Sequence, residues 1–421
     1  MKGIGERNNM EEWKEYKLRD IIQFNPSERI PKGTKYRKIG MDQLSPFCRY
    51  VYSNNYDFYK GGSKFRNGDT IMARITPCLE NGKTAYISSL SDDEVAFGST
   101  EFIVMRNIEN VSDSKFIYYL SISPTIRDIA IKSMIGSSGR QRVQQDVLEN
   151  FKMDLPSSLD DQIRIAKILS SLDDKIELNN RINANLEEQA QALFRHWFVD
   201  FEFPNEQGLP YKSNGGRFVE SEHGAIPEGW NLNQLNYFGK IVCGKTPSKT
   251  IEDYFGGNIP FIKIPDMHDN IFVINSEDSL SSSGERSQSN KTIPPYSILV
   301  SCIATVGLVC INTKKSQFNQ QINAIIPFHE SFRYYIYLKL KTMYNKLQLL
   351  ASGGSATLNL NTGQFSAIKI ENPNKKLIID FHKITTPFFK EIELRQNENI
   401  YLTQLRDSLL PKLMNNEIEI H

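Results

Sequence analysis

The sequence predicts an α+β protein made of two duplicated domains of mixed helix and strand, each followed by a long helix. Three observations support this prediction. Similar segments recur about 217 residues apart in a chain of 421 residues. Within each copy, short strand patterns and turns rich in glycine and proline come before a helix. Each copy then ends in a long stretch of residues at heptad spacing.

The repeat is visible from its first residues. Trp13 and Trp230 stand 217 positions apart, and each opens a similar segment. Further matching pairs are 69–73 with 296–300, 116–120 with 332–338, 136–139 with 353–356, and 151–156 with 367–373. A period of this length is far too long for a solenoid, so it indicates duplication of a whole domain.

The last part of each copy carries apolar residues at alternating spacings of four and three, which predicts a long helix. In the first copy the pattern runs through Ile165, Leu169, Leu172, Ile176, Asn179, Asn183, Leu186, Ala190, Leu193 and Trp197. In the second copy it runs through Phe381, Thr385, Phe388, Ile392, Arg395, Asn399, Leu402, Arg406, Leu409 and Leu413.

We expect the two helices to pack on each other as an antiparallel coiled coil with pseudo-twofold symmetry. Asn183 and Asn399 occupy the same position in the two patterns, where a polar side chain sets the register at some cost in stability. A helix that packs only on its own domain would show the same spacing and is the alternative. Pro387 and Pro411 predict kinks or a late start in the second helix.

The predicted boundaries follow from the repeat and from the two helices. They are a first domain at 1–157, a central helical spacer at 158–200, a polar linker at 201–225, a second domain at 226–373 and a C-terminal helical spacer at 374–421.

Composition places the chain among ordinary globular proteins, with 39% hydrophobic and 24% charged residues. No apolar stretch is long enough to span a membrane, and the first residues lack the apolar core of a signal peptide. The five cysteines are an odd number and form no CxxC pair. Together these features predict a cytoplasmic protein with reduced cysteines and no membrane partner.

We find no catalytic or metal-ligating constellation, and we expect the chain to bind no cofactor. Residues 239–246 fit the GxxxxGK[ST] phosphate-loop pattern, but the polar segment that follows does not open a helix. Residues 293–296, Ile-Pro-Pro-Tyr, resemble the Asn-Pro-Pro-Tyr box of amino-methyltransferases but lack its polar first residue. The six histidines are scattered and show no metal-ligand spacing.

Several segments resemble the specificity subunit of type I restriction–modification systems. The most specific is the central helix, which begins at Asp160-Asp-Gln-Ile and runs to Leu193-Phe-Arg-His-Trp-Phe. Others are Ile226-Pro-Glu-Gly-Trp230, Phe97-Gly-Ser-Thr-Glu-Phe102 and Gly244-Lys-Thr-Pro-Ser248. The last of these explains the phosphate-loop pattern as a turn that opens a domain. The resemblance covers nearly the whole chain.

The resemblance implies that each domain is a target-recognition domain that reads one half of a bipartite site in double-stranded DNA. It also implies that the helices space the domains and dock two DNA methyltransferase subunits, through which restriction motor–nuclease subunits join. The chain would then be non-catalytic, and its partners would bind S-adenosylmethionine, ATP and Mg. By the same resemblance, the methylated base is adenine, modified at N6 after being flipped out by the methyltransferase.

Three loop regions that recur in both copies, together with the polar run 319–323, supply the candidate DNA-binding residues. In the first copy they are Lys35, Arg37, Lys38, Arg74, Lys83, Arg140 and Arg142. In the second they are Lys263, Thr305, Gln320, Gln321 and Thr357. Arginine suits guanine edges and phosphates, glutamine suits adenine, and threonine suits either. Solvated loop residues would have the same composition.

Two other functions are compatible with parts of the sequence. A coiled-coil scaffold protein without a DNA role would need the helices but not the paired domains with their recurring glycine loops. An ATP-dependent enzyme would need residues 239–246 to act as a phosphate loop.

Overall fold

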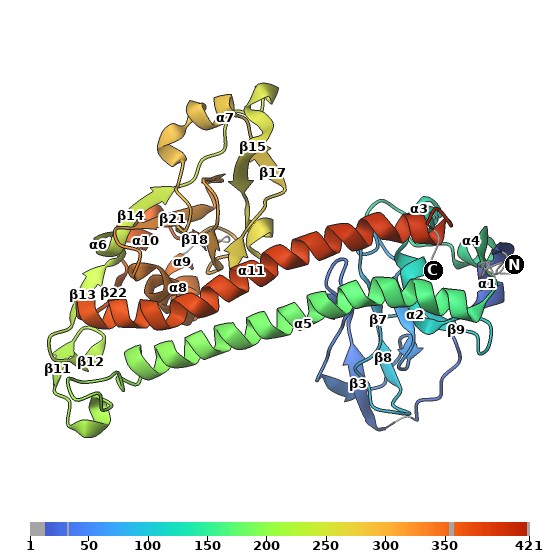
Figure 1. Cartoon of the computed structure of the whole chain (residues 1–421), viewed down its shortest axis with the longest axis horizontal. Coiled ribbons are helices and arrows are strands. Elements are labelled where there is room, and N and C mark those ends of the chain that lie inside the picture. The colour runs from blue at the N-terminus through green and yellow to red at the C-terminus, as the bar shows by residue number, and fades with distance from the viewer. Residues whose placement is uncertain (1–12, 32, 353–357, 419–421) are drawn as a thin grey trace, which may run out of the picture. The chain divides into compact units, whose positions relative to one another are not determined.

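A computed structural model describes residues 13–31, 33–352 and 358–418 (Figure 1). The chain forms two compact units. The first combines the described residues up to Leu178 with those from Asn399 onward, and the second is Asn179–Glu398. Each unit therefore contains one domain and a part of both long helices. This division differs from the predicted boundaries, which set the helices apart from the domains as spacers.

The two long helices are α5 (Leu159–Phe198) and α11 (Lys375–Met414), and each has 40 residues. Helix α11 is continuous through Pro387 and Pro411, so the late start that the prolines suggested is not found. The equal lengths agree with the equal heptad patterns of the two copies.

The first domain contains two four-stranded sheets. One has the order β2 (Ile22–Phe24), β9 (Phe102–Asn107), β6 (Thr70–Ala73) and β7 (Thr84–Tyr86). The other has the order β4 (Tyr56–Phe58), β3 (Lys35–Ile39), β8 (Ala96–Gly98) and β5 (Lys64–Phe65). Strands β3 and β8 pair in parallel.

The first of these sheets is buried on both faces because its side chains alternate between two cores. Met72 and Ile103 belong to the core that includes α2 (Ser114–Ile122) and α3 (Pro124–Lys132), whereas Ile71 and Val104 belong to a second core. This second core also contains Ile39 of the other sheet, so the two sheets share it.

The second domain repeats this plan with five strands in its larger sheet and three in its smaller sheet. Its larger sheet has the order β14 (Gly239–Cys243), β21 (Ile322–Pro327), β18 (Ile298–Ser301), β19 (Val309–Asn312) and β16 (Phe272–Val273). Its smaller sheet has the order β17 (Asp278–Leu280), β15 (Phe255–Ile262) and β20 (Gln317–Phe318), with β15 and β20 parallel. Helices α7 (Ser282–Ser287), α8 (Phe332–Thr342) and α9 (Tyr344–Ala351) complete it.

The strand pairings confirm the duplication. Antiparallel pair β1 (Trp13–Lys17) with β10 (Lys152–Pro156) corresponds to β13 (Asn231–Gln234) with β22 (Lys369–Asn372). The short helices α1 (Leu18–Ile21) and α4 (Gln145–Asn150) likewise correspond to α6 (Leu235–Phe238) and α10 (Thr362–Ser366). The predicted strands at 69–73 and 296–300 and the predicted helices at 116–120 and 332–338 are also present.

Within the second unit, the segments of α5 and α11 pack antiparallel along the predicted seam. Phe381, near the start of α11, contacts Trp197 and Phe198, at the end of α5, with ring centroids 5.9 and 4.9 Å apart. Further along α11, Arg395 donates a hydrogen bond of 3.0 Å to the side-chain oxygen of Asn179. The alternative, in which each helix packs only on its own domain, is therefore excluded.

The predicted register residues Asn183 and Asn399 are both shielded from solvent to some degree. Asn183 is buried at 8% exposure and Asn399 is half-buried, as seam positions should be. A polar contact between the helices in the second unit is made by Asn179, which receives the bond from Arg395 and donates one of 2.8 Å to Glu398. Asn179 and Arg395 are themselves equivalent seam positions, so a polar pair of this kind can fix the register.

The segment predicted as a linker at 201–225 is folded. The Phe203 ring stacks on Tyr211 and on Trp230, with centroids 4.6 and 5.3 Å apart. Strands β11 (Phe218–Ser221) and β12 (Gly224–Pro227) form a hairpin immediately before Trp230. The segment is thus an ordered part of the second unit.

No helix among the described residues is both long enough and apolar enough to cross a membrane. Likewise, no three His, Cys, Asp or Glu side chains in the described part of the chain are grouped so as to hold a metal ion. The five cysteines are free thiols, and burial raises the pKa of Cys302 to about 11.

Candidate nucleic-acid interface

In the first unit, three segments far apart in the sequence meet at the end of β6. The backbone N–H of Arg74 donates to the carbonyl of Glu101 at 2.9 Å, and the carbonyl of Arg74 accepts from Val143 at 2.9 Å. The N–H of Thr76 donates to the carbonyl of Gln141 at 3.0 Å. These bonds join residues 74–76, 99–101 and 141–143 into what we call the first three-segment surface.

The second unit joins the equivalent segments at the end of β18. The N–H of Cys302 donates to the carbonyl of Gln321 at 2.7 Å, and the carbonyl of Cys302 accepts from Leu360 at 2.8 Å. The N–H of Ala304 donates to the carbonyl of Leu358 at 3.0 Å. Residues 302–304, 319–321 and 358–360 form the second three-segment surface. Both surfaces therefore share one backbone framework.

Arginines dominate the first surface. Arg142 is about half exposed and forms an ion pair of 2.7 Å with Glu101. The hydrogen bonds from Arg142 hold the pKa of Glu101 below its usual range. Arg140 is exposed beside this pair, and its side chain extends from the loop that carries Arg142.

A polar recess of about 250 Å³ adjoins this surface and is lined in part by Arg74, Asn25, Lys64 and Thr100. Arg74 is half-buried, and its Nε has no hydrogen-bond partner among the described residues. A buried donor without a partner is costly, and no acceptor in the described part of the chain offsets this cost.

Uncharged side chains dominate the second surface. Gln320 is exposed and accepts a hydrogen bond of 2.8 Å from the hydroxyl of Thr246. The side-chain oxygen of Gln321 accepts one of 3.0 Å from Asn319. Thr305 is exposed in the loop that follows β18. This surface offers amide and hydroxyl groups, which can both donate and accept.

The phosphate-loop pattern at 239–246 belongs to this surface and is not a phosphate loop. Its first five residues form strand β14, whereas a phosphate loop is a turn between a strand and a helix. The backbone N–H of Gly244 donates to the carbonyl of Ile322 at 3.1 Å, and a Cβ at Gly244 would lie 2.0 Å from the carbonyl oxygen of Asn319. This glycine is therefore required by close packing of the chain on itself.

The three predicted cations of strand β3 lie outside the first three-segment surface. Arg37 is mostly buried and forms an ion pair of 3.0 Å with Glu94. Lys38 forms an ion pair of 3.0 Å with Asp57. Lys35 is exposed, with its ammonium group 5.5 Å from the centre of the Phe58 ring. The structure gives Arg37 and Lys38 structural roles within the domain.

Two further predicted lysines are also engaged within their own domains. The ammonium group of Lys83 donates a hydrogen bond of 2.8 Å to the backbone carbonyl of Met41. Lys263 forms ion pairs of 2.9 Å with Asp278 and 3.3 Å with Glu277. Thr357 lies outside the described residues.

Of the twelve predicted residues, the structure places four within the two surfaces, Arg74, Arg142, Gln320 and Gln321, and two next to them in the chain, Arg140 and Thr305. Sequence reasoning missed Ser99, Thr100 and Thr246, which lie among them. Matching residues 97–102 to 317–322 would have found the first two, because β8 and β20 are equivalent parallel partners of β3 and β15. The polar run 319–323 is thus the second copy of a segment in the first domain.

The chain is similar to known proteins over nearly its whole length. A family model described as the type I restriction modification DNA specificity domain matches residues 10–188 and 227–404. The chain is 36% identical over 465 residues to the specificity subunit of type I restriction enzyme HindI from Haemophilus influenzae, which covers 97% of this chain and all of that protein.

A more distant relative is the MjaIX specificity subunit of Methanocaldococcus jannaschii, which is 25% identical over 313 residues, 73% of this chain and 69% of that protein. The crystal structure of the S subunit of a type I restriction–modification system from M. genitalium shares the fold, with a TM-score of 0.56, 13% identity and 99% of each chain covered. The chain therefore belongs to the type I restriction modification DNA specificity family and is a non-catalytic specificity subunit of a type I restriction–modification system.

Proposed function

We propose that each unit reads one half of a bipartite site in double-stranded DNA through its three-segment surface. One observation carries this proposal: the two surfaces share their backbone hydrogen bonds but carry different side chains. The first presents Arg140 and Arg142, and the second presents Gln320 and Gln321. A common framework with different polar groups is what recognition of two different half-sites requires.

The chemistry of the side chains favours different bases at the two surfaces. An arginine can donate two hydrogen bonds to the O6 and N7 atoms of guanine, whereas glutamine pairs with the N6 and N7 atoms of adenine. The first half-site should therefore include a guanine contact and the second an adenine contact. In the first unit, Glu101 holds the guanidinium of Arg142, which reduces the side-chain freedom lost on binding.

The remaining parts of the proposal concern the partners. As a specificity subunit the chain acts with DNA and with the other subunits of its restriction–modification system. We further propose that the paired helices dock two methyltransferase subunits, that motor–nuclease subunits join through these, and that the complex acts in the cytoplasm. S-adenosylmethionine, ATP and Mg would be bound by those partners, and adenine N6 would be the methylated atom.

The test is the methylation motif of the chain assembled with the methyltransferase of its system, read by sequencing a randomised plasmid library. Replacing both Arg140 and Arg142 with glutamine should relax one half of the motif, at about 1–3 kcal/mol per lost base contact. Replacing Gln320 and Gln321 with alanine should relax the other half. Arg19→Gln, an exposed arginine on α1 of the first unit, is the matched control and should leave the motif unchanged.

A change in both halves from either double variant would contradict the assignment of one surface to each half-site. An unchanged motif in both double variants would show that bases are read elsewhere on the domains.

A further inference from the structure

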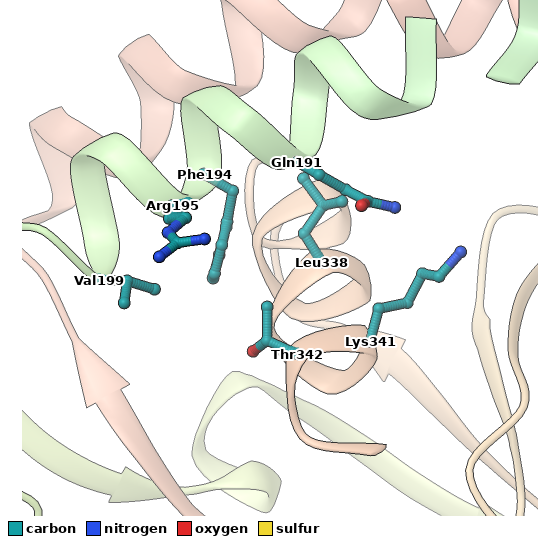
Figure 2. Close-up of a pocket in the computed structure, with 7 residues that line it drawn as sticks. All are labelled: Gln191, Phe194, Arg195, Val199, Leu338, Lys341 and Thr342. Atoms are coloured by element: carbon teal, nitrogen blue, oxygen red, sulfur yellow. The ribbon is translucent and has the colours of Figure 1, made fainter. Parts of the chain in front are cut away.

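The second unit has a pocket of about 390 Å³ between the end of α5 and the end of α8 (Figure 2). Its apolar wall is made by Phe194 and Leu338, which are both 1% exposed. Val199 forms its open edge and is 46% exposed. Figure 2 shows Phe194, Arg195 and Val199 from α5 and the residue that follows it, and Leu338 and Thr342 from α8, around one common space. The pocket is apolar inside and cationic at its rim.

The first unit has a pocket of about 370 Å³ at the equivalent place in the repeat. Leu410 of α11 stands 216 positions after Phe194 of α5, and Leu338 of α8 stands 216 positions after Ile122 of α2. Leu410 and Ile122 both line the first-unit pocket. Its open edge is made by Phe47, which is 54% exposed. The duplication has thus preserved an apolar pocket at the junction of a long helix with its domain.

Each pocket also has an arginine at its rim that no short ion pair holds in place. The guanidinium of Arg127 lies 4.7 Å from the centre of the Phe47 ring and donates to the backbone carbonyls of residues 79–80. Burial lowers the pKa of Arg127, and no carboxylate among the described residues forms an ion pair with it. Arg195 is 76% exposed, with its Nε 3.9 Å from Asp200. Asp407 also lines the first-unit pocket, but Arg406 pairs with it at 2.8 Å, so the arginine of each rim can bind an incoming carboxylate.

We propose that each pocket receives an aromatic or leucine side chain, adjacent to a carboxylate, from one of two copies of the methyltransferase subunit. This inference rests on the proposed function, which supplies the partner. A pocket that occurs once in each repeat fits a partner present in two copies, since each copy can present the same segment. The apolar walls bind the side chain and the rim arginine binds the carboxylate, an arrangement typical of a few anchoring contacts that dominate an interface.

The test uses Val199→Asp and Phe47→Asp, which place a negative charge at the open edge of each pocket. Both side chains are about half exposed, so neither change removes a core residue. Val219→Asp and Phe58→Asp are matched controls outside the pockets, at 43% and 45% exposure. Native mass spectrometry of the full chain with the methyltransferase subunit of its system measures the number of copies bound.

We expect two copies on the unaltered chain and on both controls. Each pocket variant should weaken the binding of one copy at least tenfold, and the double variant should weaken both. If Phe47→Asp fails to fold, as judged by its circular dichroism melting curve, Arg127→Gln tests the same pocket by removing only the cation.

If the double variant binds two copies with unchanged affinity, the inference is overturned. The proposed docking of methyltransferases would remain intact. Equal losses in the controls would also overturn it, because any added charge on these faces would then suffice. An unaltered chain that binds no methyltransferase would overturn both the inference and the docking that it rests on.

Discussion

In the first unit, Asp173 of α5 is almost fully buried where the helix meets its domain, and it accepts hydrogen bonds of 2.7 Å from the hydroxyl of Tyr119 and from Arg406 of α11. In the second unit, the residue 216 positions after Asp173 is Phe389. The Phe389 ring stacks on Tyr334, with centroids 4.0 Å apart and planes 5° from parallel. The same position of the repeat is thus a buried charge in one unit and a buried ring in the other.

The position that Arg406 occupies in the first unit also differs in the second. Arg406 in the first unit is equivalent to Ala190 in the second, which is fully buried. Burial alone would lower the pKa of Arg406, but the Asp173 carboxylate outweighs it and raises that pKa. The comparison shows that the framework accepts either an ion pair or a large and a small apolar side chain. The two solutions should respond differently to the loss of one member.

The largest expected effect comes from breaking the ion pair. Arg406→Leu leaves the carboxylate of Asp173 buried with Tyr119 as its remaining partner, and removing one member of a buried pair costs about 3–5 kcal/mol. The free energy of unfolding of the first unit, measured in denaturant, should fall by that amount. A loss below about 1 kcal/mol would mean that water reaches Asp173 in the variant and that the pair is not buried in solution.

A second variant tests the comparison by placing the apolar residues of the second unit at the equivalent positions of the first. Asp173→Phe with Arg406→Ala reproduces the pair Phe389 and Ala190, and Tyr119→Phe removes the hydroxyl that would lose its acceptor. Replacing a buried ion pair with well-packed apolar residues is often neutral or stabilising by about 1–4 kcal/mol. We expect this triple variant to be more stable than Arg406→Leu by several kcal/mol. If it is no more stable, the surroundings of the two positions differ more than the repeat implies.

The features that could be predicted from sequence are those with a local or periodic signal. The duplication, the α+β class and both long helices follow from the repeat and from heptad spacing. The division of each helix between two units could not be predicted, because it depends on which domain each turn contacts. The aromatic packing of residues 201–225 was also missed, since Phe203 and Tyr211 lie in a polar stretch without periodicity.

The candidate site was predicted by region better than by residue. Arg37 and Lys38 carry the positive charge that suits DNA binding. A single sequence does not show that they form ion pairs with Glu94 and Asp57. The three-segment surfaces depend on hydrogen bonds such as that between Arg74 and Glu101, which are made across 19 residues or more. Contacts of this range leave no pattern in one sequence.

Equivalent residues of the two units should also respond differently to pH. His382 of α11 stacks on Tyr334, with centroids 5.1 Å apart, whereas the equivalent residue of the first unit is Ala166. Burial lowers the pKa of His382 and Arg333 lowers it further, while Glu330 opposes them. As pH falls below the ordinary histidine pKa of 6.5, the unfolded chain takes up this proton before the folded chain does. The second unit should therefore lose stability from that pH downward.

Amide hydrogen exchange at pH 7 and pH 5.5, corrected for the intrinsic exchange rates, measures this difference unit by unit. Protection should fall in the second unit and less in the first. His382→Ala, which copies Ala166, should remove most of the difference. If the pH-dependent difference in protection persists in that variant, another group, such as the neighbouring His329, causes it.

The smallest expected effect comes from exchanging the connectivity of the two units. The first unit is assembled from two stretches of chain and the second from one. Trp13 packs against the core that contains Leu413 and Met414, so both ends of the described chain lie in one core. Joining His421 to Met1 through a flexible linker and opening the chain between Asn214 and Gly215 would make the first unit continuous and the second discontinuous.

Asn214 and Gly215 are both exposed, and new ends at exposed turns are usually tolerated. The cost of closing a loop grows slowly with its length, so the free energy of unfolding should change by no more than about 1 kcal/mol. The permuted subunit, assembled with its methyltransferase, should methylate the original sequence, because both three-segment surfaces are kept whole. A folded permutant that binds the methyltransferase but methylates a different sequence would mean that continuity of the second unit, and not only its framework, determines how it reads DNA.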